Sequence, residues 1–133
     1  MIIVDKALQK RHDQGRPIRV GMVGAGYMAR GIALQIESTM KGMRLAGVAA
    51  RNAAQAEDLY AQIGVTAQRA TDSLSSIEQA IAAGHPVVTD DPMLLCRAGG
   101  IDAIIDSTGD VEVGAHVAFE AIRNGKHVIL MNA

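Results

Sequence analysis

The sequence predicts an α/β protein of a single domain, with a doubly wound and mostly parallel sheet. Three observations support this fold class. Short apolar segments typical of strands alternate with longer segments of helical periodicity along the whole chain. The first strand leads directly into a glycine-rich turn and a helix. The later strands are almost continuously apolar, as parallel strands covered on both faces are. Together these features predict a sheet of Rossmann type, with right-handed crossovers and helices on both faces.

The glycine-rich turn after the first predicted strand has the pattern G-x-G-x-x-A. Gly24 permits a tight turn, Gly26 lets a pyrophosphate approach the backbone, and Ala29 lets the helix pack closely against the strand. The first helical turn begins with Tyr27 and Met28. Its unpaired N–H groups and the positive end of the helix dipole can hold an anion. The pattern therefore predicts binding of a dinucleotide.

Each further element is predicted from its periodicity and from the residues that begin and end it. Three helices begin at good capping residues, Asn52, Ser73 and Asp91, and Pro92 then takes the first helical position of the third. Glycines end most of the helices. In chain order we predict a strand at 18–23, a helix at 27–37, a strand at 43–50, a helix at 53–63, a brief strand at 65–67, a helix at 74–83, a short strand at 86–89, a helix at 92–99, a strand at 101–106, a helix at 111–123 and a strand at 127–131.

The chain divides into an N-terminal helical appendage, residues 1–16, and a dinucleotide-binding domain, residues 17–133. Residues 73–100 exceed what a minimal mononucleotide-binding unit needs, so we interpret them as an insertion. The last strand stops at the edge of the sheet where ligands bind, just before the sequence ends. We therefore expect a fragment of a longer enzyme, whose catalytic domain lies beyond residue 133.

The segment after the second strand predicts which coenzyme is bound. NAD sites commonly place Asp or Glu here for the ribose 2′-hydroxyl, whereas NADP sites place Arg near the 2′-phosphate. This chain has Arg51, which suits a bidentate phosphate contact, and Asn52, which can add a hydrogen bond while it caps the next helix. We therefore predict NADP(H); the alternative is that Arg51 is only an exposed surface charge. A methyltransferase domain would also need an acidic residue here, to hold the ribose of its methyl donor. It is therefore the weaker alternative.

Small polar residues follow the last two predicted strands. We expect Ser107, Thr108 and Gly109 after one strand, and Asn132 after the other, to face the nicotinamide half of a dinucleotide. Turn formation alone explains Ser107 equally well. Asp106 is a candidate catalytic acid, although a residue at such a turn more commonly accepts hydrogen bonds from backbone amides. The sequence assigns no catalytic residue.

Composition and charge argue against several classes of partner. The chain has 13 basic and 14 acidic side chains, and a net charge of -1 gives no attraction to nucleic acid or to an anionic membrane. Its apolar N-terminal stretch is too short to span a membrane. Cys96, the single cysteine, suits a cytoplasmic protein and is expected to be a small buried hydrophobe. No metal is predicted, because no metal-ligand spacing relates the four histidines, His12, His85, His116 and His127.

The polar helix that ends at Gly15 and the segments 17–26, 101–109 and 125–133 together resemble the N-terminal domain of bacterial oxidoreductases similar to homoserine dehydrogenase, and the resemblance covers nearly the whole chain. The branch they resemble is similar to 1-deoxy-D-xylulose-5-phosphate reductoisomerase. The resemblance implies NADPH-dependent hydride transfer. In the full protein, this hydride transfer can be coupled to isomerisation of a sugar phosphate. It also implies a catalytic and dimerising domain beyond residue 133. These enzymes have Ala-Asn-Lys at the last strand, where this chain has Met131, Asn132 and Ala133, so Asn132 corresponds and the lysine does not.

Two classes of function follow from the sequence. The first is the cofactor-binding domain of an NADP-linked oxidoreductase that is inactive without its catalytic domain. The second is a non-catalytic nucleotide-sensing module, because a fold alone does not fix a function. The sequence leaves homo-oligomer formation open.

Overall fold

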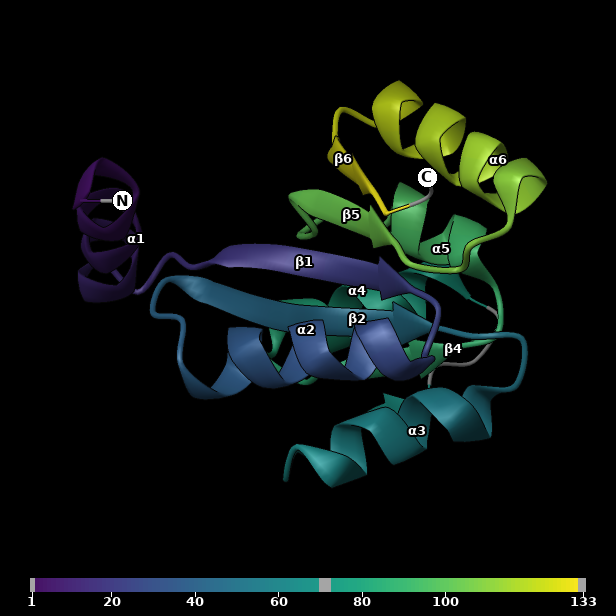
Figure 1. Ribbon diagram of the computed structural model, residues 1–133, viewed down its shortest axis with the longest axis horizontal. Coiled ribbons are helices and arrows are strands. Elements are labelled where there is room, and N and C mark those ends of the chain that lie inside the picture. The colour runs from purple at the N-terminus through teal and green to yellow at the C-terminus, as the bar shows by residue number, and fades with distance from the viewer. Residues whose placement is uncertain (1, 70–72, 132–133) are drawn as a thin grey trace.

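The computed structural model describes residues 2–69 and 73–131, and within them parallel strands form a six-stranded sheet in the order β3-β4-β2-β1-β5-β6 (Figure 1). The strands are β1 (Ile18–Val23), β2 (Met43–Ala49), β3 (Gln68–Arg69), β4 (Val87–Thr89), β5 (Ala103–Asp106) and β6 (His127–Leu130). The helices are α1 (Ile2–Asp13), α2 (Tyr27–Ser38), α3 (Ala53–Gln62), α4 (Leu74–Ala82), α5 (Pro92–Arg97) and α6 (Val111–Arg123). This architecture confirms the predicted α/β fold with a doubly wound parallel sheet.

The direction in which strands are added reverses at β1. From β1 the chain builds β2, β3 and β4 on one side, and then crosses back to place β5 and β6 on the other side. In open α/β sheets, ligands bind beyond the carboxyl ends of the strands at such a switch point. The topology therefore brings the turn after β1 and the turn after β5 together at the edge where a ligand is expected.

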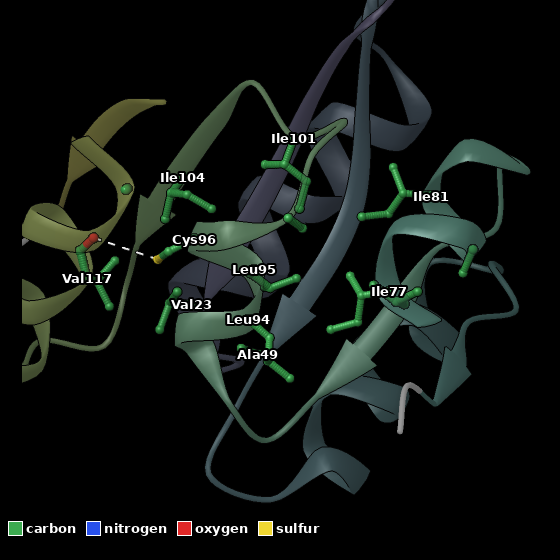
Figure 2. Packing of buried hydrophobic residues seen from close by; sticks show 14 residues of the cluster. Val23, Ala49, Ile77, Ile81, Leu94, Leu95, Cys96, Ile101, Ile104 and Val117 are labelled. Carbon is green, nitrogen blue, oxygen red and sulfur yellow. Dashed lines mark hydrogen bonds between the residues drawn. The ribbon is translucent and has the colours of Figure 1, made fainter. Parts of the chain in front are cut away.

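Two groups of helices cover the two faces of the sheet. α2 and α3 pack on one face through a cluster that includes Met22 and Tyr60, and the buried Tyr60 hydroxyl donates a hydrogen bond to the Leu45 carbonyl oxygen at 2.8 Å. α4, α5 and α6 cover the other face, where Leu95 and Ile104 are fully buried (Figure 2). Burial of each such side chain contributes roughly 1.5–3 kcal/mol. By contrast, α1 has no buried residue and lies beyond the amino ends of the strands (Figure 1).

Side chains cap four of the helices. Asn52, Ser73 and Asp91 each accept a hydrogen bond from a backbone N–H in the first turn of α3, α4 and α5, as the sequence predicts. Asp110 does the same for α6, where Oδ1 accepts from the Val113 N–H at 3.1 Å. Such caps contribute about 1 kcal/mol each. They fix where these helices begin relative to the strands before them.

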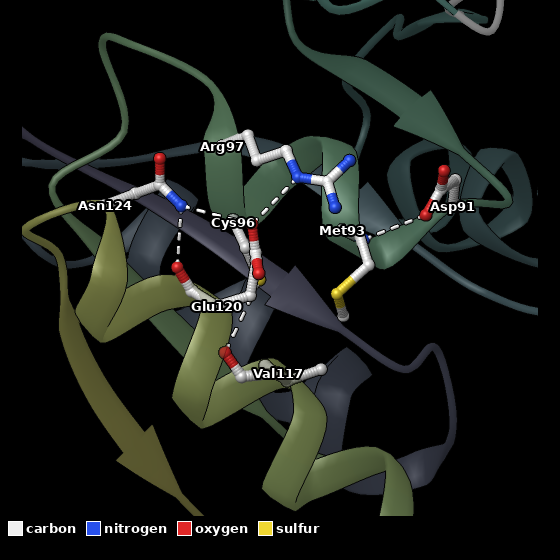
Figure 3. Close-up of polar contacts among 7 residues, drawn as sticks. All are labelled: Asp91, Met93, Cys96, Arg97, Val117, Glu120 and Asn124. Atoms are coloured by element: carbon white, nitrogen blue, oxygen red, sulfur yellow. Dashed lines mark hydrogen bonds and ion pairs between the residues drawn. The ribbon is translucent and has the colours of Figure 1, made fainter.

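α5 and α6 are joined by polar contacts (Figure 3). Arg97 Nε of α5 donates to Glu120 Oε1 of α6 at 2.9 Å. Within the end of α6, the Asn124 side-chain amide donates to the Glu120 carbonyl oxygen at 2.8 Å. The hydrogen bond from Arg97 lowers the pKa of Glu120. Beside this contact the fully buried Cys96 thiol lies 3.7 Å from the Val117 carbonyl oxygen, and burial raises its pKa to about 11. Cys96 therefore packs as a small hydrophobe, as expected.

Two expectations about the outer part of the sheet were wrong. The brief strand predicted at residues 65–67 lies instead at Gln68–Arg69, because Val65 and Ala67 pack against the α2–α3 cluster and strand pairing starts only at Gln68. Residues 73–100 are more than an insertion, because they supply β4, which pairs with β2 and lies inside the sheet. The edge strand on this side of the sheet is the two-residue β3.

None of the described helices is long and apolar enough to cross a lipid bilayer.

Candidate functional site

A cavity of about 420 Å³ lies at the carboxyl edge of the sheet, a volume suited to binding part of a small organic ligand. It is lined by residues that follow four of the strands, among them Gly24, Ala25 and Gly26 after β1, Ala50 and Arg51 after β2, Asp90 after β4, and Ser107 and Thr108 after β5. The strand order explains this convergence, because β1 lies between β2 and β5 and all strands end at the same edge.

Gly24 makes the turn from β1 into the cavity. Its φ of 106° lies in the region that favours glycine, and its N–H donates to the Ala49 carbonyl oxygen at 2.8 Å. A Cβ at this position would lie 2.7 Å from Ser107 Oγ. Backbone conformation and space both require glycine here, so the first glycine of the motif serves the fold itself.

The presence of glycine at position 26 has a different reason. It precedes α2 with ordinary extended backbone angles, and a Cβ built on it would meet no described atom within 4 Å. Nothing in the described part of the fold therefore demands a glycine, and the open space suits a ligand that approaches the backbone closely.

The start of α2 is suited to an anion. Gly26 provides no side-chain cap, and the Arg30 N–H is the donor to its carbonyl oxygen at 3.0 Å. The N–H groups of Tyr27, Met28 and Ala29 precede that first helical hydrogen bond and so have no acceptor within the helix. These amides and the helix dipole favour negative charge at the end of the cavity that contains Gly26.

The turn after β5 is held by its own side chains. Ser107 Oγ donates to the Val23 carbonyl oxygen at 2.9 Å, which ties the end of β5 to the end of β1. Asp106 is fully buried, and its Oδ1 accepts from the Thr108 N–H at 3.1 Å and from Thr108 Oγ1 at 2.8 Å. Asp106 is thus the turn-forming residue that the sequence favours. The hydroxyl of Ser107 likewise serves the turn while the residue lines the cavity.

Arg51 reaches the cavity from the other side of β1. Its side chain is 91% exposed, and Nη2 lies 3.9 Å from Asp110 Oδ2. Asn52 is not among the residues that line the cavity, and its Oδ1 accepts from the Ala54 N–H at 2.9 Å. Arg51 is therefore placed to meet a ligand, whereas Asn52 serves mainly as a helix cap.

Several residues predicted for the site lie outside this cavity. Tyr27 and Met28 line a separate groove of about 640 Å³ along α2 and the end of α3, and neither is among the residues that line the cavity. Gly109, with a φ of 72°, is in the turn but does not line the cavity. Asn132 lies outside the described residues.

Two carboxylates that line the cavity are absent from the sequence-based site. Asp90 follows β4 and Asp110 precedes α6. The signal that would have found Asp90 is the pairing of β4 with β2, which places its end at this edge. Within residues 2–69 and 73–131, no group of three or more His, Cys, Asp or Glu side chains is arranged to hold a metal ion.

The fold and this site define the class of dinucleotide-binding α/β domains: a glycine turn at the switch point, an uncapped helix start and a cavity at the strand ends. Residues 18–130 match the GFO/IDH/MocA family, described as an oxidoreductase family with an NAD-binding Rossmann fold. The chain belongs to this family and is an NAD(P)-binding Rossmann domain of an oxidoreductase.

Solved structures show the same fold. The myo-inositol dehydrogenase of Lactobacillus casei with NAD(H) and myo-inositol matches with a TM-score of 0.65 at 18% identity, over 86% of this chain and 28% of that one. A variant of KijD10, a 3-ketoreductase of Actinomadura kijaniata, with TDP-benzene and NADP, matches with a TM-score of 0.60 at 24% identity, over 86% and 29%. The chain thus spans less than a third of the length of these proteins. No curated protein sequence matches it.

Proposed function

We propose that this chain is the coenzyme-binding part of an NADP(H)-dependent oxidoreductase that catalyses hydride transfer. The observation that carries the proposal is the position of Arg51, which lines the same cavity as Gly24 and Gly26 at the end of β2. Residues at this position meet the 2′ group of the adenosine ribose in Rossmann domains. Ala50, Arg51 and Asn52 offer no carboxylate there to hold a 2′-hydroxyl.

When bound, the coenzyme supplies or accepts the hydride, and the chain binds and orients it. The N–H groups at the start of α2 would hold the diphosphate, and the small residues at Gly24 and Gly26 allow it to lie against the backbone. Arg51 would hold the adenosine end. The nicotinamide half would extend toward the end of β5, where Ser107 and Thr108 line the cavity.

The substrate and the catalytic groups belong to the finer part of the proposal. Asp106 is buried and bonded within its turn. Of the two carboxylates that line the cavity, Asp110 caps α6 and faces Arg51, and Asp90 follows β4, on the side of β1 away from β5. We therefore propose that a further domain of a longer protein supplies the catalytic groups, and that this chain alone shows no turnover. Coupling to isomerisation of a sugar phosphate rests on the sequence resemblance alone.

Calorimetric titration with NADPH and NADH tests the coenzyme preference. We expect NADPH to bind at least about tenfold more tightly, and Arg51→Gln to remove most of that difference, as loss of a charge-assisted contact should. Arg123→Gln, on the exposed end of α6, is the matched control and should change neither affinity. Equal affinities for the two coenzymes in the unmodified chain would contradict the NADP preference. Turnover assays of a longer protein that contains this domain separate an enzyme from a nucleotide sensor.

A further inference from the structure

We propose that Asp110 tunes the coenzyme preference of this chain by competing with the 2′-phosphate of NADPH for Arg51. This inference rests on the function proposed above and assigns a role to a residue that the dinucleotide motif does not include. Asp110 acts through Arg51 and is therefore a positioning residue.

The two side chains meet from opposite sides of β1. Arg51 follows β2, whereas Asp110 lies between β5 and α6, and β1 separates β2 from β5 in the sheet. Arg51 Nη2 nevertheless lies 3.9 Å from Asp110 Oδ2, and both residues line the cavity that contains Gly24 and Gly26. The ion pair therefore spans the cleft in which a dinucleotide would lie.

The side chains of Arg51 and Asp110 differ in how strongly their surroundings hold them in place. Asp110 Oδ1 accepts from the Val113 N–H at 3.1 Å and caps α6, so this carboxylate is fixed, and its other oxygen is left toward Arg51. The Arg51 side chain is 91% exposed, against 42% for Asp110. Arg51 is thus the partner that moves. A 2′-phosphate would compete with Asp110 for the Arg51 guanidinium, whereas NADH carries no such group and so does not compete for it.

The solvent exposure of the Arg51–Asp110 ion pair determines how much the pair can lower the affinity for NADPH. Exposed ion pairs stabilise weakly, so breaking this one should lower NADPH affinity by no more than about fivefold. The carboxylate of Asp110 also repels any anionic coenzyme, and that general effect must be separated from the effect through Arg51.

Asp90 provides the matched control. It lines the same cavity, is exposed, and forms no ion pair with any of the residues in the described ranges. Asp90→Asn removes the same charge from the cavity without releasing Arg51. Asp110→Asn removes the charge and releases Arg51, and it keeps the α6 cap because Asn caps helices as well as Asp.

Calorimetry with NADPH and NADH on Asp110→Asn, Asp90→Asn, Arg51→Gln and the double variant of Arg51→Gln with Asp110→Asn tests the inference. We expect Asp110→Asn to increase the ratio of NADPH affinity to NADH affinity about two- to fivefold. The ratio should stay unchanged in Asp90→Asn, and Asp110→Asn should have no effect on it in the Arg51→Gln background. Urea unfolding should show that Asp110→Asn folds as stably as the parent chain.

Each of the following results would overturn the inference, and they are distinguishable. Equal changes of the ratio in Asp110→Asn and Asp90→Asn would show a general charge effect. A change of the ratio that persists in the Arg51→Gln background would show that Asp110 does not act through Arg51. An unchanged ratio in Asp110→Asn, with NADPH binding still dependent on Arg51, would remove the role of Asp110 and leave the proposed function standing. If Arg51→Gln alone leaves NADPH binding unchanged, or neither coenzyme binds, the proposed function fails and the inference with it.

Discussion

Gly24 and Ser107 are packed so closely that a Cβ on the glycine would lie 2.7 Å from the serine hydroxyl oxygen. This contact joins the turn after β1 to the turn after β5. Ser107 strengthens the junction, because its hydroxyl donates to the Val23 carbonyl oxygen at 2.9 Å. Two contacts therefore tie the floor of the cavity together on the side where we expect a nicotinamide ring.

Gly24→Ala should destabilise the fold and weaken coenzyme binding together. The new side chain meets Ser107 at a φ of 106°, and such backbone strain costs about 1–3 kcal/mol. Urea unfolding measures the loss. Gly15→Ala is the control, because Gly15 has a φ of 66° but no described atom within 4 Å of its Cβ position, so it carries the strain without the contact. Equal losses in the two variants would contradict a role for the Ser107 contact.

Gly26→Ala should separate binding from folding. The position has ordinary backbone angles and open space around its Cβ, so we expect the free energy of unfolding to change by no more than about 1 kcal/mol. NADPH affinity should fall strongly, because the methyl group would occupy the space that a diphosphate needs. Calorimetry and urea unfolding on the same sample give both values. Unchanged NADPH affinity would show that the ligand does not approach this residue.

Cys96 should resist thiol reagents in the folded protein. Burial raises its pKa to about 11, so at about pH 8 roughly one thiol in a thousand is ionised even before access is considered. The side chain is fully buried as well. Labelling with a chromogenic disulfide reagent should follow the fraction of unfolded protein in urea. Rapid labelling without denaturant would show that the α5–α6 contact opens readily.

The Arg97–Glu120 contact should make stability depend on acidity. The hydrogen bond from Arg97 places the folded-state pKa of Glu120 below its unfolded value. The contact therefore contributes its full stabilisation above the ordinary pKa of a glutamate carboxyl. This contribution is lost as the pH falls through the lowered pKa of Glu120 in the folded protein. Urea unfolding between about pH 7 and about pH 3 should show a shallower decline in Arg97→Met than in the parent chain. Parallel declines would show that this pair contributes nothing measurable.

Much of the fold follows from local patterns that are visible in the sequence. The caps Asn52, Ser73 and Asp91 act within one helical turn, and the predicted ends of their helices agree with the structure to within one or two residues. The order of strands is a different matter. Which strand lies beside β2 depends on packing between segments far apart in the chain, and neither Val87 nor Gln68 carries a local signal for it.

The candidate site, like the fold, could be predicted only where it depends on local sequence. Gly24, Gly26 and Arg51 follow from the motif and from the end of β2, because their positions depend on neighbouring residues in the chain. Asp90 and Asp110 were missed because they reach the cavity only through the sheet order, which brings the end of β4 and the turn between β5 and α6 to the same edge as the end of β1. Sequence patterns locate a glycine turn well and the charges around it poorly.

Because the start of α2 has no side-chain cap, coenzyme binding there should raise the thermal stability of the domain. α3, α4, α5 and α6 each begin with a side-chain acceptor, and α2 begins with Gly26, which supplies none. A domain without bound coenzyme would therefore lack stabilisation at the helical turn that a diphosphate would complete, and we expect this turn to fray first on this face. A bound coenzyme would act as the missing cap, so the melting temperature should rise with coenzyme concentration and report occupancy directly.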